Sequence, residues 1–241
     1  RLTLEEKRKR PLLALHPSES DQKILFTQRL PQYAKSRYQI AAQNSPQEIA
    51  EEIIQKIEAF DKTIWIKSNR RSYPCILRAC DADWLAPYLS TRISSKHVLL
   101  LSDQRVGEQH GDTLLQELEN AGFDVTKVYV SNTEQAKSLE QAAKLYEICL
   151  KNNFNRDSAI IGLGGGMIGD LAGFLAATYM RGIPLYLIPT TTLAAVDAAV
   201  GAKNALNFAG TKNVIGSYYP PQGVLISSAL LRTQNPQEHY W

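Results

Sequence analysis

The sequence has few cysteines, no long apolar run and no apolar leader segment. Its 241 residues include three cysteines, which cannot all pair and show no CxxC spacing. Free thiols are therefore expected rather than a disulfide framework or a zinc site. Apolar runs such as Val98–Leu101 fall far short of the ~20 residues of a membrane span. We expect a cytoplasmic protein with no membrane partner.

The sequence also lacks a strong excess of charge of either sign. It carries 27 Lys and Arg against 24 Asp and Glu, a formal charge of +3. The positive excess lies in residues 1–72, where bases and acids are interleaved and no zinc-finger or RNA-recognition signature occurs. We therefore expect no nucleic-acid partner. Small anions such as phosphates are the better candidates for its ligands.

Residues 63–241 are predicted to form an α/β domain. A strand pair is expected at 63–67 and 73–78, followed by alternating helices and strands. The helices are expected at 81–90, 110–121, 134–151 and 167–179, and the strands at 97–102, 124–130, 158–163 and 184–188. Such alternation predicts a mainly parallel, Rossmann-like sheet with helices on both faces. After Pro189, the density of Pro, Gly and Asn predicts loops that surround a site.

Residues 1–62 are predicted to form a separate, mostly helical unit. Ser45-Pro46-Gln47-Glu48 is a capping box with proline at the first helical position. Isoleucines at helical spacing follow it, so an amphipathic helix is expected over 46–60. We place the boundary between the two units at 62/63.

A glycine-rich turn follows the expected strand 158–163. Residues 164–170 read Gly-Gly-Gly-Met-Ile-Gly-Asp and contain G-x-G-x-x-G. Glycine lets a backbone approach a pyrophosphate, and the next helix offers free N–H groups. A tight strand-to-helix turn without a ligand explains the motif about equally well. No acidic residue lies about 20 positions on, so an ordinary Rossmann dehydrogenase is not expected.

Polar residues cluster beyond this turn in an otherwise apolar context. Polar groups in such a context must pair with one another or with a ligand, which favours a functional site over a solvated face. Two ammonium groups and a guanidinium suit a phosphate. The cluster consists of Arg181, Asp197, Lys203, Asn207, Lys212 and Asn213.

Several motifs together resemble 3-dehydroquinate synthase of the shikimate pathway. They are Gly-Leu-Gly-Gly-Gly-Met-Ile-Gly-Asp at 162–170, Ala-Ala-Thr-Tyr-Met-Arg-Gly at 176–182, Pro-Thr-Thr at 189–191, Val-Asp at 196–197, Gly201, Lys203 and Lys-Asn-Val-Ile-Gly at 212–216. The resemblance implies a lyase of aromatic amino-acid biosynthesis. It would convert 3-deoxy-arabino-heptulosonate 7-phosphate into 3-dehydroquinate and phosphate, with NAD acting catalytically and a divalent metal, zinc or cobalt.

The resemblance also implies roles for single residues. Those on the pyrophosphate and nicotinamide side would be Gly165, Gly166 and Asp170. Those on the adenosine side would be Asp103, Glu134 and Lys137. Thr190 and Thr191 would line the dinucleotide groove, and Lys212 would lie beside the cofactor. Asp197, Lys203 and Asn213 would contact the sugar ring. Arg181 would reach the substrate phosphate, across the interface of a homodimer.

The sequence departs from the family's pattern at several positions. Ala202 and Asn204 replace a glycine and a threonine, and Arg105 replaces an asparagine on the adenosine side. Thr133 replaces a glycine, and 208–209 read Phe-Ala instead of His-Pro. The family's metal ligands, a Glu and two His, would fall beyond this chain. The four scattered histidines here do not form a zinc site, so no complete metal site is expected.

The first 60 residues resemble the C-terminal third of shikimate kinase. The match consists of Arg-Pro-Leu-Leu at 10–13 and Gln-Arg-Leu-Pro-Gln-Tyr at 28–33. It implies that Arg10 faces ATP phosphates and that Arg29 binds the shikimate carboxylate, which suits bidentate guanidinium groups. A solvated helix face is the alternative for both. The phosphate loop G-x-x-x-x-G-K-[ST] is missing, so we expect a fragment of a fused kinase–synthase polypeptide that is inactive alone.

Two other readings stay open. A sister sugar-phosphate cyclase or a metal-dependent polyol dehydrogenase would share the fold. Lys203 and Lys212-Asn213 favour the synthase over a polyol dehydrogenase, which has no phosphate to expel, whereas Ala202 and Asn204 leave the cyclases open. A non-catalytic nucleotide-binding remnant is the third reading.

Overall fold

The computed structural model describes residues 62–68, 71–79 and 81–234, together with Ser18, Ser20 and Thr27. The expected helix 46–60 and the two arginines assigned to a kinase-like unit, Arg10 and Arg29, lie outside the described residues. The boundary at 62/63 therefore stays a prediction.

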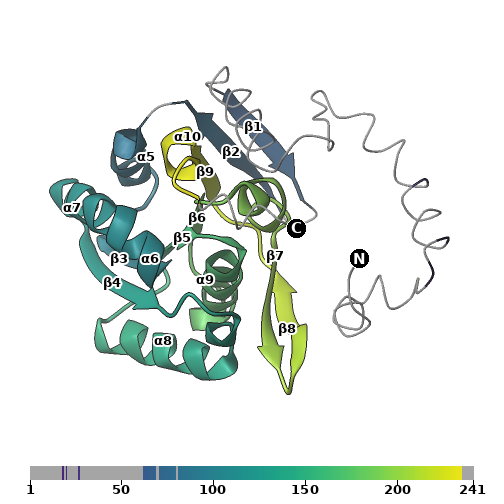
Figure 1. Ribbon diagram of the computed structural model, residues 1–241. Helices are drawn as coiled ribbons and strands as arrows, with labels where there is room; N and C mark the ends of the chain where they lie inside the picture. Colours follow the sequence, from purple (N-terminus) through teal and green to yellow (C-terminus); the bar gives the residue numbers. More distant parts are fainter. Residues whose placement is uncertain are drawn as a thin grey trace. The chain divides into compact units, whose positions relative to one another are not determined.

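A seven-stranded sheet forms the centre of the described region (Figure 1). Its strands lie in the order β1-β2-β9-β6-β5-β3-β4, and all neighbours are parallel except β1 and β2. The prediction of a mainly parallel sheet is confirmed. The strands are β1 (Lys62–Lys67), β2 (Ser72–Arg78), β3 (His97–Asp103), β4 (Asp124–Val130), β5 (Ala159–Gly164), β6 (Leu185–Pro189) and β9 (Gly223–Ser227).

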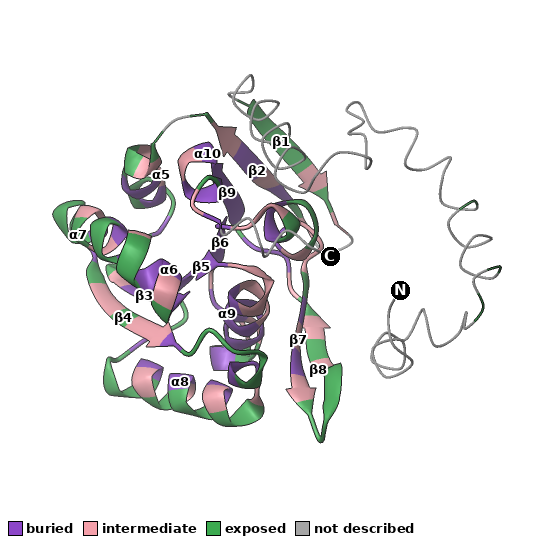
Figure 2. Ribbon diagram, in the orientation of Figure 1, coloured by how far each residue is buried: buried purple, intermediate pink, exposed green. Residues whose placement is uncertain are grey.

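Helices cover both faces of this sheet, as predicted (Figure 2). Alternate residues of β3 show why: Leu99 and Leu101 pack in the core beneath α8 and α9, whereas Val98 and Leu100 pack beneath α5 and α7. A strand buried on both faces reads as a continuous apolar run. The longer helices are α5 (Leu85–Ser90), α7 (Asp112–Asn120), α8 (Leu139–Lys151) and α9 (Gly166–Thr178), and the short ones are η1 (Ala82–Trp84), α6 (Gln104–Val106), η2 (Gly107–Gly111), η3 (Glu134–Ala136), η4 (Tyr179–Arg181), η5 (Ala194–Ala198) and α10 (Ser228–Leu231).

A capping residue explains why one helix differs from its expected boundaries. The helix expected over 134–151 begins at Leu139 because the Ser138 hydroxyl accepts a hydrogen bond from the Gln141 N–H at 3.2 Å. Residues 134–136 form a separate turn of 3₁₀-helix. Glu134 and Lys137 therefore lie on a loop rather than on a continuous helix.

The region after Pro189 corrects the sequence-based expectation of loops. Besides η5, it forms a hairpin of β7 (Lys203–Phe208) and β8 (Thr211–Tyr218), and then β9 and α10. β9 is fully buried between β2 and β6. The prediction was wrong because turn residues such as Gly210, at φ +76°, mark the ends of short strands as well as loops. The hairpin packs along α9 (Figure 1).

Two of the three cysteines are free and buried, as expected. Burial raises the pKa of the Cys75 thiol to about 12 and that of Cys149 to about 11. Both stay protonated at neutral pH and pack as small apolar side chains. Within the described ranges, no helix is both long and apolar enough to span a membrane.

Candidate functional site

The strand order places a topological switch point between β3 and β5. From β3 the chain runs outward to β4 and then returns to β5 on the other side of β3. In open parallel sheets, ligands bind beyond the carboxyl ends of the strands at such a point. Asp103 is the last residue of β3 and Gly164 is the last of β5. The two sequence signals for a dinucleotide therefore meet at the position that the topology favours.

The glycines of the turn after β5 divide into two groups. A Cβ on Gly164 would lie 2.8 Å from Ile168, so close packing of α9 on β5 requires a glycine there. A Cβ on Gly165 or Gly166 would meet only ordinary contacts at 3.4 and 3.5 Å, and one on Gly169 would meet nothing within 4 Å. Packing therefore explains the first glycine, and it leaves the other three without a structural reason.

A small cavity of about 10 Å³ opens beside these glycines, and its lining consists of Gly, Ala, Leu and Pro. Gly165 is the N-cap of α9 and offers no side chain to cap it. The first N–H groups of a helix and its positive dipole end attract a phosphate. The cavity therefore offers the N–H donors and the positive dipole end that favour a phosphate oxygen. Its lining consists of Gly162, Gly164, Gly165, Gly166, Gly169, Leu187, Pro189, Ala194, Ala198 and Ala199.

The two threonines after β6 differ in their surroundings. Thr190 is 3% exposed, and its hydroxyl finds no hydrogen-bond partner among the described residues. Thr191 uses its hydroxyl to accept a hydrogen bond from the Ala194 N–H at 3.2 Å. An orphaned buried hydroxyl calls for an explanation such as an absent ligand. Thr190 thus fits a groove role, whereas Thr191 also has a structural one.

Asp103 is buried at the end of β3. Its carboxylate accepts a hydrogen bond from the Val106 N–H at 3.0 Å and so caps α6. Arg105 lies on the same short helix and is half-buried. Asp103 therefore has a structural task, and the bond to Val106 occupies one of its two carboxylate oxygens.

A buried ion pair joins the loop before α8 to the start of α9. Lys137 donates to Asp170, and the two side chains are 6% and 19% exposed. Lys137 also donates to the Asn213 amide oxygen at 2.5 Å, and Asp170 accepts from the Ala205 N–H at 3.2 Å. Burial raises the pKa of Asp170, and Lys137 opposes that rise. The structure thus brings together three residues that the sequence assigned to the site.

A second set of contacts joins the same loop to the hairpin. The Asn207 amide donates to the Glu134 carboxylate at 2.9 Å and accepts from the Asn213 N–H at 3.0 Å. The Lys212 ammonium lies 3.9 Å from that carboxylate. Glu134, Lys212 and Asn213 therefore lie side by side around Asn207.

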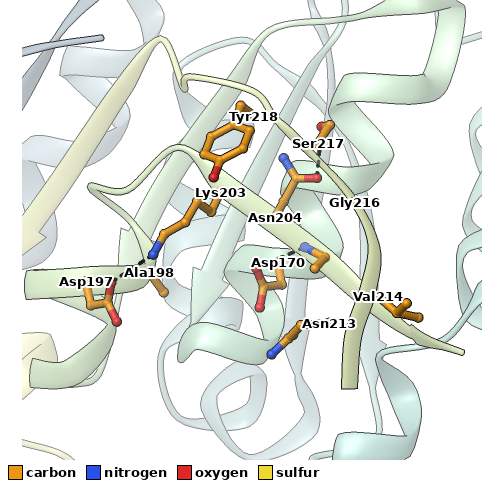
Figure 3. A pocket seen from close by; sticks show the side chains of 11 residues that line it. Asp170, Asp197, Ala198, Lys203, Asn204, Asn213, Val214, Gly216, Ser217 and Tyr218 are labelled. Atoms are coloured by element: carbon orange, nitrogen blue, oxygen red, sulfur yellow. Dashed lines mark hydrogen bonds and ion pairs between the residues drawn. The ribbon is translucent and has the colours of Figure 1, made fainter. Parts of the chain in front are cut away.

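The hairpin and η5 form the walls of an open cleft of about 560 Å³ (Figure 3). Lys203 faces Asp197 across it at 3.7 Å, with both side chains more than half exposed. Charges held close together and open to solvent can contact a polar ligand without the full penalty of burial. The lining residues are Asp170, Asp197, Ala198, Lys203, Asn204, Ala205, Asn213, Val214, Gly216, Ser217 and Tyr218.

One of the residues assigned to the sugar substrate does not line this cleft. Arg181 is exposed at the end of η4, beyond α9, and does not line the cleft. Arg10 and Arg29 lie outside the described residues. Sequence reasoning gave no role to Ser217 and Tyr218, which do line it. The sequence of β8, Thr-Lys-Asn-Val-Ile-Gly-Ser-Tyr, has no apolar alternation that would have marked them.

The described part of the chain contains no group of three or more His, Cys, Asp or Glu side chains that could hold a metal ion. His97 pairs with Asp124 at 3.0 Å, and His110 lies 2.7 Å from the Thr233 hydroxyl. Burial lowers the pKa of His110. Both histidines thus have structural partners. His16 and His239 lie outside the described residues.

Ala202 stands in a strained backbone position beside the cleft. Its φ is +54°, in the left-handed region that a Cβ disfavours. We predict that Ala202→Gly raises the free energy of unfolding by about 0.5–1 kcal/mol, because relief of strain exceeds the added freedom of the unfolded chain. Denaturant unfolding measures this change. A loss of stability would show that the left-handed conformation is not strained here.

Residues 127–240 match the family model described as 3-dehydroquinate synthase N-terminal. A 3-dehydroquinate synthase of Desulforamulus reducens is 44% identical over 176 residues, which cover 73% of this chain and 49% of the relative. The chain therefore spans about half the length of this relative.

Two solved structures resemble the fold at low identity. A 2-deoxy-scyllo-inosose synthase with carbaglucose-6-phosphate, NAD⁺ and Co²⁺ is 27% identical with a TM-score of 0.64, over 72% of this chain and 48% of the other. A 2-epi-5-epi-valiolone synthase of Streptomyces hygroscopicus with NAD⁺ and Zn²⁺ is 26% identical with a TM-score of 0.62, over 70% and 46%.

Proposed function

We propose that this chain forms the NAD site of an enzyme of the 3-dehydroquinate synthase family, whose N-terminal domain is carried by residues 127–240. The observation that carries the proposal is the glycine turn at the switch point. Gly165, Gly166 and Gly169 have no packing reason to be glycine, and a bound pyrophosphate supplies one. The unpartnered hydroxyl of Thr190 supports the same groove.

The proposed reaction releases phosphate from 3-deoxy-arabino-heptulosonate 7-phosphate and closes a carbocycle. When bound, NAD supplies a reversible hydride acceptor. Lys203 and Asn213 present donors to the oxygens of the sugar ring, and Asp197 holds the Lys203 ammonium at 3.7 Å. Glu134, Lys137 and Lys212 form the polar wall on the cofactor side. Asp103 keeps one carboxylate oxygen for a ribose hydroxyl.

Two parts of the reaction lie beyond the described cleft. Arg181 is exposed and away from the cleft, so we assign it to the substrate phosphate in a second copy of the chain, in a homodimer. The proposed reaction also uses a divalent metal, zinc or cobalt, whose ligands we place outside this chain. On this proposal the chain alone is inactive, and phosphate release by the purified chain would contradict it.

A kinase portion is proposed for residues 1–62 on the two sequence motifs alone. Arg10 would face the phosphates of ATP and Arg29 the carboxylate of shikimate. Equilibrium binding of shikimate to the chain, compared with an Arg29→Gln variant, tests this assignment. Equal binding by both would contradict it.

A sister sugar-phosphate cyclase is the second candidate. The 2-deoxy-scyllo-inosose synthase and the 2-epi-5-epi-valiolone synthase, each bound to NAD⁺ and a metal ion, share the fold, and Ala202 and Asn204 depart from the 3-dehydroquinate synthase pattern. Asn204 is buried and accepts from the Ser217 hydroxyl at 3.1 Å, so its amide shapes the floor of the cleft. Turnover of the heptulosonate phosphate against other sugar phosphates separates the two candidates.

The NAD site is tested by a substitution that the fold tolerates. An alanine at Gly166 would meet only Ala198, at 3.5 Å, and alanine has the better helix propensity. We predict that Gly166→Ala keeps or raises the melting temperature and weakens NAD binding at least tenfold in calorimetry, because its Cβ occupies the pyrophosphate cleft.

Gly223→Ala is the matched control. Its Cβ would also meet a neighbour at 3.5 Å, the Tyr186 ring, but at the amino end of β9. It is expected to bind NAD like the unaltered chain. Equal affinity in the Gly166 variant would place the dinucleotide elsewhere.

A further inference from the structure

The hairpin that carries Lys212 and Asn213 has an irregular register. Leu206 pairs with Ile215, but Phe208 pairs with Thr211. An advance of two residues along β7 thus corresponds to an advance of four residues along β8. The residues 212–214 bulge out of β8 opposite one residue of β7, Asn207. Bulges of this kind aim side chains at neighbouring sites and leave ladder hydrogen bonds unmade.

The Asn207 side chain replaces the missing ladder bond. Its amide oxygen accepts from the N–H of Asn213 at 3.0 Å. Asn213 has a φ of +55°, which is tolerated by asparagine but unfavourable for most residues. The bond therefore supports the strained residue at the point where its own side chain turns toward Lys137, 2.5 Å away.

The same residue fastens the hairpin to the loop at 134–137. The Asn207 amide nitrogen donates to the Glu134 carboxylate at 2.9 Å, and its backbone N–H donates to the Lys137 carbonyl at 2.8 Å. Asn207 thus uses both ends of its side chain, one on each of the two elements that carry the proposed cofactor and substrate groups.

We propose that Asn207 is a positioning residue: its amide holds the β8 bulge against the loop at 134–137 and so sets Lys212 and Asn213 in place for the cofactor and the substrate. The inference rests on the proposed function. Only an amide of this length supplies a donor to Glu134 and an acceptor to the Asn213 N–H together. Aspartate lacks the donor, and alanine lacks both.

Three variants of the full chain separate these contributions. Asn207→Ala is expected to speed hydrogen exchange of the Asn213 amide at least tenfold in NMR, and to weaken NAD binding at least tenfold in calorimetry. Asn207→Asp keeps the acceptor, so the Asn213 amide stays protected, but NAD binding still weakens because two carboxylates now face each other. Asn152→Ala is the control, since among the described residues the Asn152 side chain bonds only to the Ile148 carbonyl at the end of α8. It should change neither readout.

Equal NAD affinity in Asn207→Ala and the unaltered chain would overturn the proposal, as would equal exchange at Asn213. If the alanine variant fails to fold, Asn207→Asp decides: NAD affinity equal to that of the unaltered chain would overturn the role of Glu134. If the unaltered chain does not bind NAD, the proposed function fails. The exchange rates then still show whether Asn207 holds the bulge, and equal rates would overturn that part too.

Discussion

Replacing Lys137 by methionine is expected to lower the free energy of unfolding by about 3 kcal/mol at neutral pH, because removal of one partner leaves a buried charge uncompensated. The Asp170 side chain is only 19% exposed and would keep one hydrogen bond, from the Ala205 N–H. We place the effect at the low end of the range for buried pairs because Asp170 keeps some contact with solvent. Denaturant unfolding of the purified variant measures it.

The loss of stability in the Lys137→Met variant should depend on pH in a defined direction. Burial already raises the pKa of Asp170 above its ordinary value of 3.8, and removal of Lys137 should raise it further. A carboxyl with a raised pKa stabilises the fold below its unfolded pKa, and that contribution is lost as pH rises through the folded pKa. Lys137→Met should therefore destabilise the chain less near pH 5 than near pH 8.

Asp170→Asn in the Lys137→Met background is the control for this mechanism. The amide removes the buried charge and keeps an acceptor for the Ala205 N–H, so part of the lost stability should return. A double variant no more stable than Lys137→Met, with no dependence on pH, would show that the ion pair does not hold the loop to α9.

Lys203→Met is expected to reduce turnover of the heptulosonate phosphate about 10²–10³-fold in the active enzyme, because it removes a preorganised cationic group at the reacting sugar. The fold should be unaffected. Lys203 and Asp197 are 59% and 64% exposed, and exposed pairs of this kind contribute about 0–1 kcal/mol. A large loss of rate without a loss of stability is the signature of a catalytic group.

Lys127→Met is the matched control for that substitution. Lys127 pairs with Asp112 at 2.9 Å, also with both side chains exposed, but it lies on β4 away from the cleft. Its removal should leave turnover unchanged. Equal rates in the Lys203 variant and this control would remove Lys203 from the reaction.

Local signals made most of the α/β core predictable from the sequence. Strands such as β3 and β5 are buried on both faces, and a continuous apolar run marks such a strand without knowledge of its neighbours. The helix expected over 134–151 begins later than predicted because Ser138 caps α8. A capping residue affects only the first turn of a helix, so the helical periodicity of the sequence did not reveal it. The region after Pro189 was missed for a different reason. β9 gains its place only by insertion between β2 and β6, which no local pattern reveals.

The candidate site was predictable as a set of residues but not as a set of contacts. Motifs pointed to Lys137, Asp170 and Asn213 separately. Their direct contact depends on a loop, a helix and a hairpin that are 33 and 76 residues apart along the chain. The task of Asn207 could not be predicted because it depends on a bulge in the register of β8. Physical detail of this kind appears only once the strands are paired.

The central claim is that NAD binds beyond the carboxyl ends of β3 and β5. An NMR titration of the chain with NAD, followed through the backbone amides, tests it most directly. The account predicts that the largest shifts fall at Asp103, at the turn 164–166 and around the hairpin residues 212–213. Saturable binding whose shifts fall elsewhere, or an absence of shifts at millimolar NAD, would contradict it.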